Sequence, residues 1–142
     1  MFRLPVWAYR LRLGWLLGHR FLMITHQGRR TGQVRHTVLE VVRHDRTTGE
    51  FIIVAGYGKT SDWYRNIQAA PALEIQVGGR RFSPIQRFLT PEEVSKEFVG
   101  YERRHPRLAR TLGRMSGLEY DGSEEQRITL AAELPMIALR PR

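Results

Sequence analysis

Residues 27–35 hold the side chains with the clearest chemical potential in this chain. Two glycines, one threonine and three arginines stand within these nine residues, between apolar runs at 21–25 and 37–42. Gly28 and Gly32 carry no Cβ, so the backbone there can turn tightly or approach a ligand closely. Arginine forks bind phosphate or carboxylate oxygens bidentately, and exposed backbone N–H groups can form an anion-binding nest. The segment predicts a strand–basic loop–strand unit that holds a polyanionic small molecule, or alternatively a solvated hairpin loop.

A second glycine-rich loop, at 56–60, follows the apolar run 51–55. That run is typical of a buried strand. If its strand and the strands at 21–25 and 37–42 are neighbours, the two loops flank a single cleft. Ser61 is predicted to cap a short helix through Ala69.

The other elements alternate between strands and helices. Runs at 73–77 and 80–88 predict a hairpin around a Gly-Gly turn, with Pro84 on an edge or at a bulge. A capping box at Thr90 and Glu93 predicts a helix that runs to about Tyr101. Two further helices, at 105–115 and 123–133, and a closing strand at 135–139 complete the list.

This order predicts an α+β, mainly β fold. Five or six short strands with one inserted short helix and C-terminal helices favour a small antiparallel β-barrel. A barrel of this size fills its interior with side chains and leaves ligands to its rim loops. The length of 142 residues and the apolar content of 42% fit a single domain, 1–142.

Composition excludes several kinds of chemistry. The chain has no cysteine, which rules out disulfides and thiolate catalysis, and its five histidines show no metal-binding spacing, so no metal is expected. The formal net charge is +9, and 21 of the 23 basic residues are arginines, which favours an anionic partner. Arginines at 103–114 predict a solvated helix face, with a lipid-headgroup or nucleic-acid surface as the alternative. No nucleic-acid-binding motif accompanies them, so no specific nucleic acid is expected.

Residues 1–18 predict an N-terminal amphipathic helix. Tryptophans and leucines alternate with arginines, and the uncharged part is too short to span a bilayer. No secretory cleavage site is present. The helix covers one end of the core, or it lies in a membrane interface. The protein is therefore expected in the cytoplasm, either free or peripheral on the inner face of the plasma membrane.

The order of the motifs resembles the deazaflavin-dependent nitroreductase family, which has a split β-barrel fold related to FMN-binding proteins. The pattern LxxTxxGRRTGxxRxTxL is followed by VAxxG, WYRNIxAxPxxEIQVGGRRF and LPMIALRP. The resemblance covers roughly residues 2–142 and lies in the combination of these pieces. It implies a bound 5-deazaflavin, coenzyme F-420, whose phosphodiester and oligoglutamate tail make it a polyanion. It also implies hydride transfer to quinones, nitro compounds or similar electron-poor acceptors.

The resemblance also assigns residues to the coenzyme. It implies a tail- and phosphate-binding loop, a second loop at the ring and phosphate, and a helix start whose N–H groups favour an anion or a ring carbonyl. These cofactor-binding residues are Gly28, Arg29, Arg30, Thr31, Gly32, Arg35, Gly56, Tyr57, Gly58, Lys59, Asp62, Trp63, Tyr64 and Asn66. Trp63 and Tyr64 have core packing as the alternative. Tyr57, Tyr64 and Tyr120 are the phenols expected on the substrate side as proton donors, with water as the alternative donor.

Two other functions remain open at this point. One is an FMN-binding split-barrel protein. The other is a non-catalytic peripheral membrane or anion-binding module that uses residues 1–18 and the arginine-rich surface. Split barrels often pair, so a homodimer is expected, and the small-molecule partner is an electron acceptor.

Overall fold

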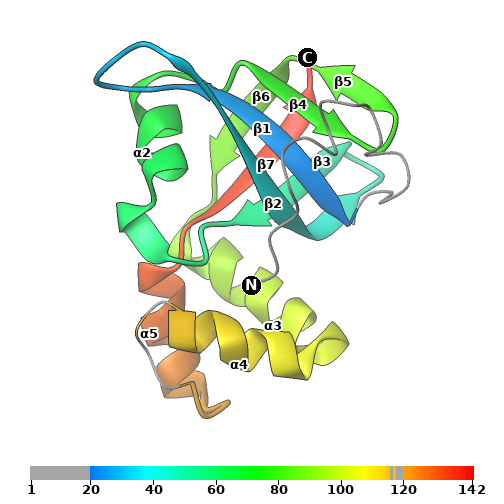
Figure 1. The fold of residues 1–142 in the computed structure, drawn as a ribbon. Coiled ribbons are helices and arrows are strands. Elements are labelled where there is room, and N and C mark those ends of the chain that lie inside the picture. The colour runs from blue at the N-terminus through cyan, green and yellow to red at the C-terminus, as the bar shows by residue number, and fades with distance from the viewer. Residues whose placement is uncertain (1–19, 116, 118–119) are drawn as a thin grey trace.

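The computed structural model describes residues 20–115, 117 and 120–142, and these contain a seven-stranded antiparallel sheet (Figure 1). Its strands are β1 (Phe21–Gln27), β2 (Val34–Asp45), β3 (Glu50–Val54), β4 (Glu74–Val77), β5 (Arg80–Phe82), β6 (Pro84–Phe88) and β7 (Met136–Pro141). They lie in the order β5-β4-β1-β2-β3-β7-β6. The two outermost strands, β5 and β6, are separated in the chain by Ser83 alone, so the sheet curls until its edges meet. The result is a nearly closed barrel of the split-barrel type, as the sequence predicts.

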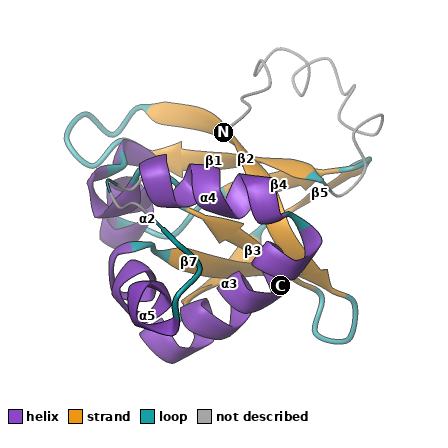
Figure 2. Ribbon diagram, turned by 90° about the horizontal axis from the view of Figure 1, so that it is seen from below, coloured by secondary structure: helices purple, strands orange, loops and turns teal. Residues whose placement is uncertain are grey.

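Helices cover two parts of this barrel. They are α2 (Asp62–Ala69), α3 (Pro91–Arg104), α4 (Pro106–Met115) and α5 (Glu124–Glu133), and a short 3-10 turn, η2 (Gly58–Thr60), precedes α2. In Figures 1 and 2, α3, α4 and α5 gather in one layer against the barrel, whereas Figure 1 shows α2 beside the loop that joins β1 to β2. The predicted N-terminal helix at 1–18 lies outside the described residues.

The predicted hairpin at 73–88 is only partly correct. β4 and β5 form it around the Gly-Gly turn, but the second strand stops at Phe82 and resumes as β6, which pairs with β7 instead of β4. One long predicted strand therefore becomes two, and six expected strands become seven. Pro84, which cannot donate a backbone hydrogen bond, is the first residue of an edge strand, as expected.

Helix starts follow the predicted capping residues at α3 and α5 but not at α2. At α3, Thr90 accepts from the N–H of Glu93, and the Glu93 carboxylate accepts from the N–H of Thr90. At α5, Ser123 caps the N–H of Gln126, whose side chain accepts from Asp121. Ser61 occupies the N-cap position of α2, but its hydroxyl accepts no helix N–H. The prediction of a side-chain cap at Ser61 is therefore wrong.

Two apolar clusters stabilise the barrel, one on each face of the sheet. Because strand residues alternate between faces, β3 sends Phe51 and Ile53 into one cluster and Ile52 and Val54 into the other. The barrel cluster fills the interior and includes residues of β1, β4 and α2. The helix-layer cluster joins β3 and β7 to α3, α4 and α5, with Phe98 among its fully buried side chains.

Candidate functional site

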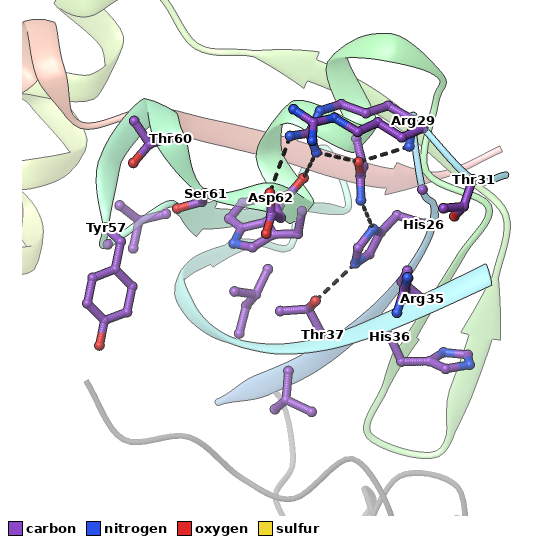
Figure 3. Close-up of a pocket in the computed structure, with 18 residues that line it drawn as sticks. His26, Arg29, Thr31, Arg35, His36, Thr37, Tyr57, Thr60, Ser61 and Asp62 are labelled. Carbon is purple, nitrogen blue, oxygen red and sulfur yellow. Dashed lines mark hydrogen bonds and ion pairs between the residues drawn. The ribbon is translucent and has the colours of Figure 1, made fainter. Parts of the chain in front are cut away.

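A cleft of about 670 Å³ opens where β2 separates from β3 (Figure 3). β3 pairs with β2 only at residues Val41–Asp45 of β2. Residues 34–40 pair with β1 on one side, and no described strand pairs with them on the other side. The chain after β3 instead turns away through residues 55–61 into α2. The loop 28–33 and the segment 56–61 both line the cleft, so the structure brings the two glycine-rich loops together.

Most of the residues assigned from the sequence meet in this cleft. Those that line it are Gly28, Arg29, Arg30, Thr31, Arg35, Gly56, Tyr57, Asp62, Trp63 and Asn66. Those that do not are Gly32, Gly58, Lys59, Tyr64 and Tyr120. Trp63 packs in the barrel cluster and also borders the cleft, so its position is compatible with both expectations.

The loop after β1 is a tight turn that depends on its glycines. The N–H of Gly28 donates to the carbonyl of Gln33 at 2.8 Å, and the N–H of Gly32 donates to the carbonyl of Gly28 at 2.8 Å. Gly32 has φ +71°, in the left-handed region that favours glycine. A Cβ on Gly28 would lie 2.9 Å from the Thr31 hydroxyl, so no larger residue fits without a shift. The turn therefore brings its arginines to the cleft in a fixed backbone frame.

Arg29 is used inside the protein. Its backbone N–H and its guanidinium both donate to Asn66 Oδ1, at 3.1 and 2.9 Å, and the guanidinium also meets Asp62 Oδ1 at 3.3 Å. These contacts bind the loop to α2. Arg30 and Arg35 are exposed, line the same cleft and form no ion pair with any described residue. They are the arginines available to an anion.

Below Arg29, three side chains form a hydrogen-bonded chain along the cleft (Figure 3). Asn66 Nδ2 lies 3.0 Å from His26 Nδ1, and His26 Nε2 lies 2.9 Å from Thr37 Oγ1. His26 is only 3% exposed. Burial, and then the nearby His36 and Arg35 charges, lower the pKa of His26 to about 4, while Asp62 opposes this shift. His26 is therefore neutral near pH 7.

The N-terminus of α2 opens on the cleft without a side-chain cap. Ser61 and Asp62 line the cleft there, and the buried Ser61 hydroxyl oxygen has no hydrogen-bond partner among the described residues. The first N–H groups of a helix have no partners within the helix and carry partial positive charge. This edge of the cleft therefore presents donors that suit a phosphate or a ring carbonyl.

The three phenols expected on the substrate side lie in different places. Tyr57 lines the cleft and is 57% exposed. Tyr64 packs edge-on against Trp63 and Phe88, and burial raises its pKa. Tyr120 packs edge-on against Phe98 in the helix-layer cluster and borders a separate cavity beside α5. Only Tyr57 of the three borders the cleft.

Sequence reasoning missed several residues that line the cleft. They are His26, His36, Thr37, Val38, Leu39, Val54, Thr60 and Ser61. A signal for His26 was present, since the alternation of β1 places it on the same face as the apolar Ile24 and Leu22. A histidine at an otherwise inward-facing position marks a polar point at the barrel rim.

The described residues hold no group of three or more His, Asp or Glu side chains that could bind a metal. Within the same part of the chain, no helix is long and apolar enough to cross a membrane. The site is thus a basic cleft with glycine-built turns at the rim of a split barrel.

Fold and cleft define a split β-barrel protein with a basic cleft at its rim. Residues 1–117 match the family described as F420H(2)-dependent quinone reductase. The chain therefore belongs to this family, which makes it a reductase that uses coenzyme F-420 and confirms the resemblance drawn from the motifs.

Solved structures agree on the fold. An F420-H2-dependent reductase, FDR-A, has a TM-score of 0.58 at 20% identity over 87% of this chain and 96% of its own. A structure described as a domain-swapped dimer has a TM-score of 0.58 at 19% identity, over 96% of this chain and all of its own. An FMN-binding protein related to pyridoxamine 5'-phosphate oxidase, from Nostoc punctiforme, has a TM-score of 0.55 at 14% identity, over 97% of this chain and 81% of its own. At these identities the likeness concerns the fold.

Proposed function

We propose that this reductase binds the deazaflavin in the cleft between β2 and α2 and transfers hydride to a quinone. One observation carries the proposal: Arg30 and Arg35, which form no ion pair with any described residue, line the same cleft as the N-terminus of α2, which has no side-chain cap. A polyanionic coenzyme needs cationic and N–H donors of this kind at its phosphates and carboxylates. The quinone as acceptor is supported by the family description.

The residues present suit such a coenzyme. The buried Ser61 hydroxyl, at the cleft wall, has no hydrogen-bond partner among the described residues. We assign Arg30 and Arg35 to the anionic tail, and Ser61 with the α2 N-terminus to a phosphate or ring oxygen. Arg29 positions the loop. The assignments of Thr31, Gly32, Gly56, Gly58 and Lys59 to the coenzyme stay predictions from the family motif.

The coenzyme, when bound, supplies the hydride from its ring carbon, and the protein supplies position and surroundings. Reaction requires that donor and acceptor be held at contact distance and that water be excluded. Val38, Leu39 and Val54 line the cleft as apolar residues, which limits the access of water to this part of it. Tyr57, the phenol that borders the cleft, is assigned to the acceptor side.

Assembly and location are also proposals. The domain-swapped dimer among the similar structures supports a homodimer of this chain. The net charge of +9 supports attraction to an anionic membrane surface, where quinones dissolve. We assign the chain as one domain over 1–142, in the cytoplasm or at the inner face of the membrane.

A titration with the oxidised coenzyme tests the binding site. Replacing both Arg30 and Arg35 by alanine removes two charge-assisted contacts, which we expect to raise the Kd roughly 30-fold or more and to reduce its dependence on salt. The matched control is Arg46→Ala with Arg110→Ala, two exposed arginines outside the cleft. An unchanged Kd in the R30A/R35A variant contradicts the assignment of the loop.

The same titration with FMN separates the two cofactors. Tighter binding of FMN than of the deazaflavin would contradict the proposed coenzyme site. The acceptor is then tested by following oxidation of the reduced coenzyme with a soluble benzoquinone and, in parallel, with a nitroaromatic compound. Faster turnover of the nitroaromatic compound would replace the quinone as the proposed acceptor.

A further inference from the structure

Arg29, Asn66, His26 and Thr37 form a continuous series of hydrogen bonds. The contacts of Asn66 determine which group donates and which accepts at each step of this series. Asn66 Oδ1 faces two groups of Arg29, the backbone N–H and the guanidinium, that can only donate. A flipped amide would place its NH₂ against these donors. The carboxamide oxygen therefore faces Arg29, and the NH₂ group faces His26.

This orientation determines the tautomer of His26. Its Nδ1 lies 3.0 Å from the Asn66 NH₂, which donates, so Nδ1 must accept and carry no hydrogen. The neutral ring then carries its hydrogen on Nε2, which donates to Thr37 Oγ1 at 2.9 Å. Burial holds the ring neutral, so the tautomer is the same throughout the neutral pH range.

This order of donors and acceptors leaves the hydroxyl hydrogen of Thr37 without an acceptor in the series. Its oxygen already accepts from His26, so its hydroxyl hydrogen must point to another acceptor. No described side chain or backbone carbonyl is hydrogen-bonded to it, and Thr37 lines the cleft in which the coenzyme is proposed to bind. His26 thus prevents the hydroxyl from donating to the imidazole ring.

We propose that the Thr37 hydroxyl donates a hydrogen bond to an acceptor atom of the ligand, a carbonyl oxygen or an unprotonated ring nitrogen, and that Arg29, Asn66 and His26 orient it. The inference rests on the proposed coenzyme site. It makes Thr37 a binding residue and the other three positioning residues. It also means that Arg29, the one arginine of the loop committed to internal contacts, acts on the ligand through this chain.

The first test measures the tautomer of the wild-type protein without ligand. Long-range ¹⁵N–¹H NMR of the imidazole distinguishes a hydrogen on Nε2 from one on Nδ1. We expect the Nε2–H form at pH 7. The Nδ1–H form would mean that Thr37 donates to His26, and it would overturn the proposal without any binding experiment.

The second test compares Thr37→Val with Thr37→Ser in the coenzyme titration. Valine removes the hydroxyl and keeps the shape, so we expect the Kd to rise roughly 3- to 10-fold, the value of one neutral hydrogen bond. Serine keeps the hydroxyl and should bind nearly as the wild type does. Thr47→Val, in the exposed turn that follows β2, is the control for the loss of a threonine hydroxyl.

The outcomes separate this inference from the proposed function. Wild-type binding with an unchanged Kd in Thr37→Val overturns the Thr37 assignment and leaves the coenzyme site intact. Equal weakening in the serine and valine variants also overturns it, since the hydroxyl would then not carry the effect. A wild-type protein that does not bind the deazaflavin overturns the proposed function together with the ligand assigned to Thr37.

Discussion

Arg29 and Arg30 of the loop after β1, and Arg35 at the start of β2, have the same side chain but different partners. Arg29 is held by Asn66 and Asp62, whereas Arg30 and Arg35 have no described ion-pair partner. The contact with Asp62 is weak, because the Asp62 side chain is 87% exposed and such pairs contribute little. The contact with Asn66 matters more, since it also fixes a buried amide. Residues 29–35 therefore combine an arginine that builds the site with two that are free to bind an anion.

His26 predicts a specific dependence of stability on pH. Its pKa is about 4 in the folded protein, against 6.5 for a histidine in an unfolded chain, so the unfolded state takes up the proton first as the pH falls. Stability is thus fully present above about pH 6.5 and is lost as the pH falls toward about 4. The charges that face the ring are His36 and Arg35, which oppose its protonation, and Asp62, which favours it. A difference of about 2.5 pH units corresponds to at most about 3 kcal/mol.

Urea denaturation at several pH values checks this prediction. A glutamine at position 26 can accept from Asn66 and donate to Thr37 but does not titrate. We expect the wild type to lose about 2 kcal/mol more stability than His26→Gln does between about pH 6.5 and 4.5. His105→Gln, on the exposed C-terminal end of α3, should keep the wild-type slope. Parallel curves for the wild type and His26→Gln would contradict the buried neutral histidine.

At the level of elements, we expect alanine at the N-cap of α3 to lower stability, and alanine at the N-cap of α2 to weaken coenzyme binding instead. Thr90 caps α3 through its hydroxyl, so Thr90→Ala should cost about 1 kcal/mol of unfolding free energy. Ser61 stands at the N-cap of α2 but caps nothing, and its oxygen is buried without a partner among the described residues. Ser61→Ala should therefore change stability by less than about 0.5 kcal/mol, while it weakens coenzyme binding.

Denaturation measures the stability of these two variants, and titration with the coenzyme measures their affinity. Thr90→Ala should bind the coenzyme like the wild type, because α3 begins away from the cleft. A loss of stability in Ser61→Ala equal to that in Thr90→Ala would show that Ser61 serves the helix instead of the ligand.

The elements themselves were largely predictable because their signals are local. Short apolar runs mark β1 and β2, and the capping box at Thr90 and Glu93 marks the start of α3. The break at Ser83 was not predictable, since it follows from the closure of the barrel. β-type residues continue across 80–88, and only the pairing of β6 with β7 separates them into two strands.

The sequence predicted that the two glycine-rich loops meet at one cleft, but it did not place Gly32 and Gly58 outside the cleft lining and it did not show the hydrogen bonds of His26. A motif shows which residue types stand together, so the loop at 28–35 was found from sequence. The contact of His26 with Asn66 joins residues forty positions apart, and it depends on how α2 lies against β1. No local pattern shows that contact. For the same reason the sequence did not distinguish the internal role of Arg29 from the external roles of Arg30 and Arg35.

At the level of the whole molecule, the two apolar clusters differ in their relation to α2, the helix that borders the cleft. The barrel cluster includes Trp63 and Ile67 of α2, the helix that borders the cleft. The helix-layer cluster lies on the other face of β3, and Phe98 contacts the rings of Tyr101 and Tyr120 there. Phe98 does not line the cleft, although Val54 of the same cluster does. A change in the barrel cluster reaches the cleft directly through α2.

Conservative core substitutions should separate the two clusters. Phe98→Leu removes part of a buried ring and should cost about 1–2 kcal/mol of unfolding free energy, and Ile67→Val should cost about 1 kcal/mol. Because Ile67 lies next to Asn66 and supports α2 against the barrel, its shortening should raise the coenzyme Kd by about threefold. Phe98→Leu should change that Kd by less than about twofold despite its larger loss of stability. If affinity instead followed stability in both variants, the helix layer and the cleft would be one cooperative unit, and the division of the molecule into two clusters would have no functional meaning.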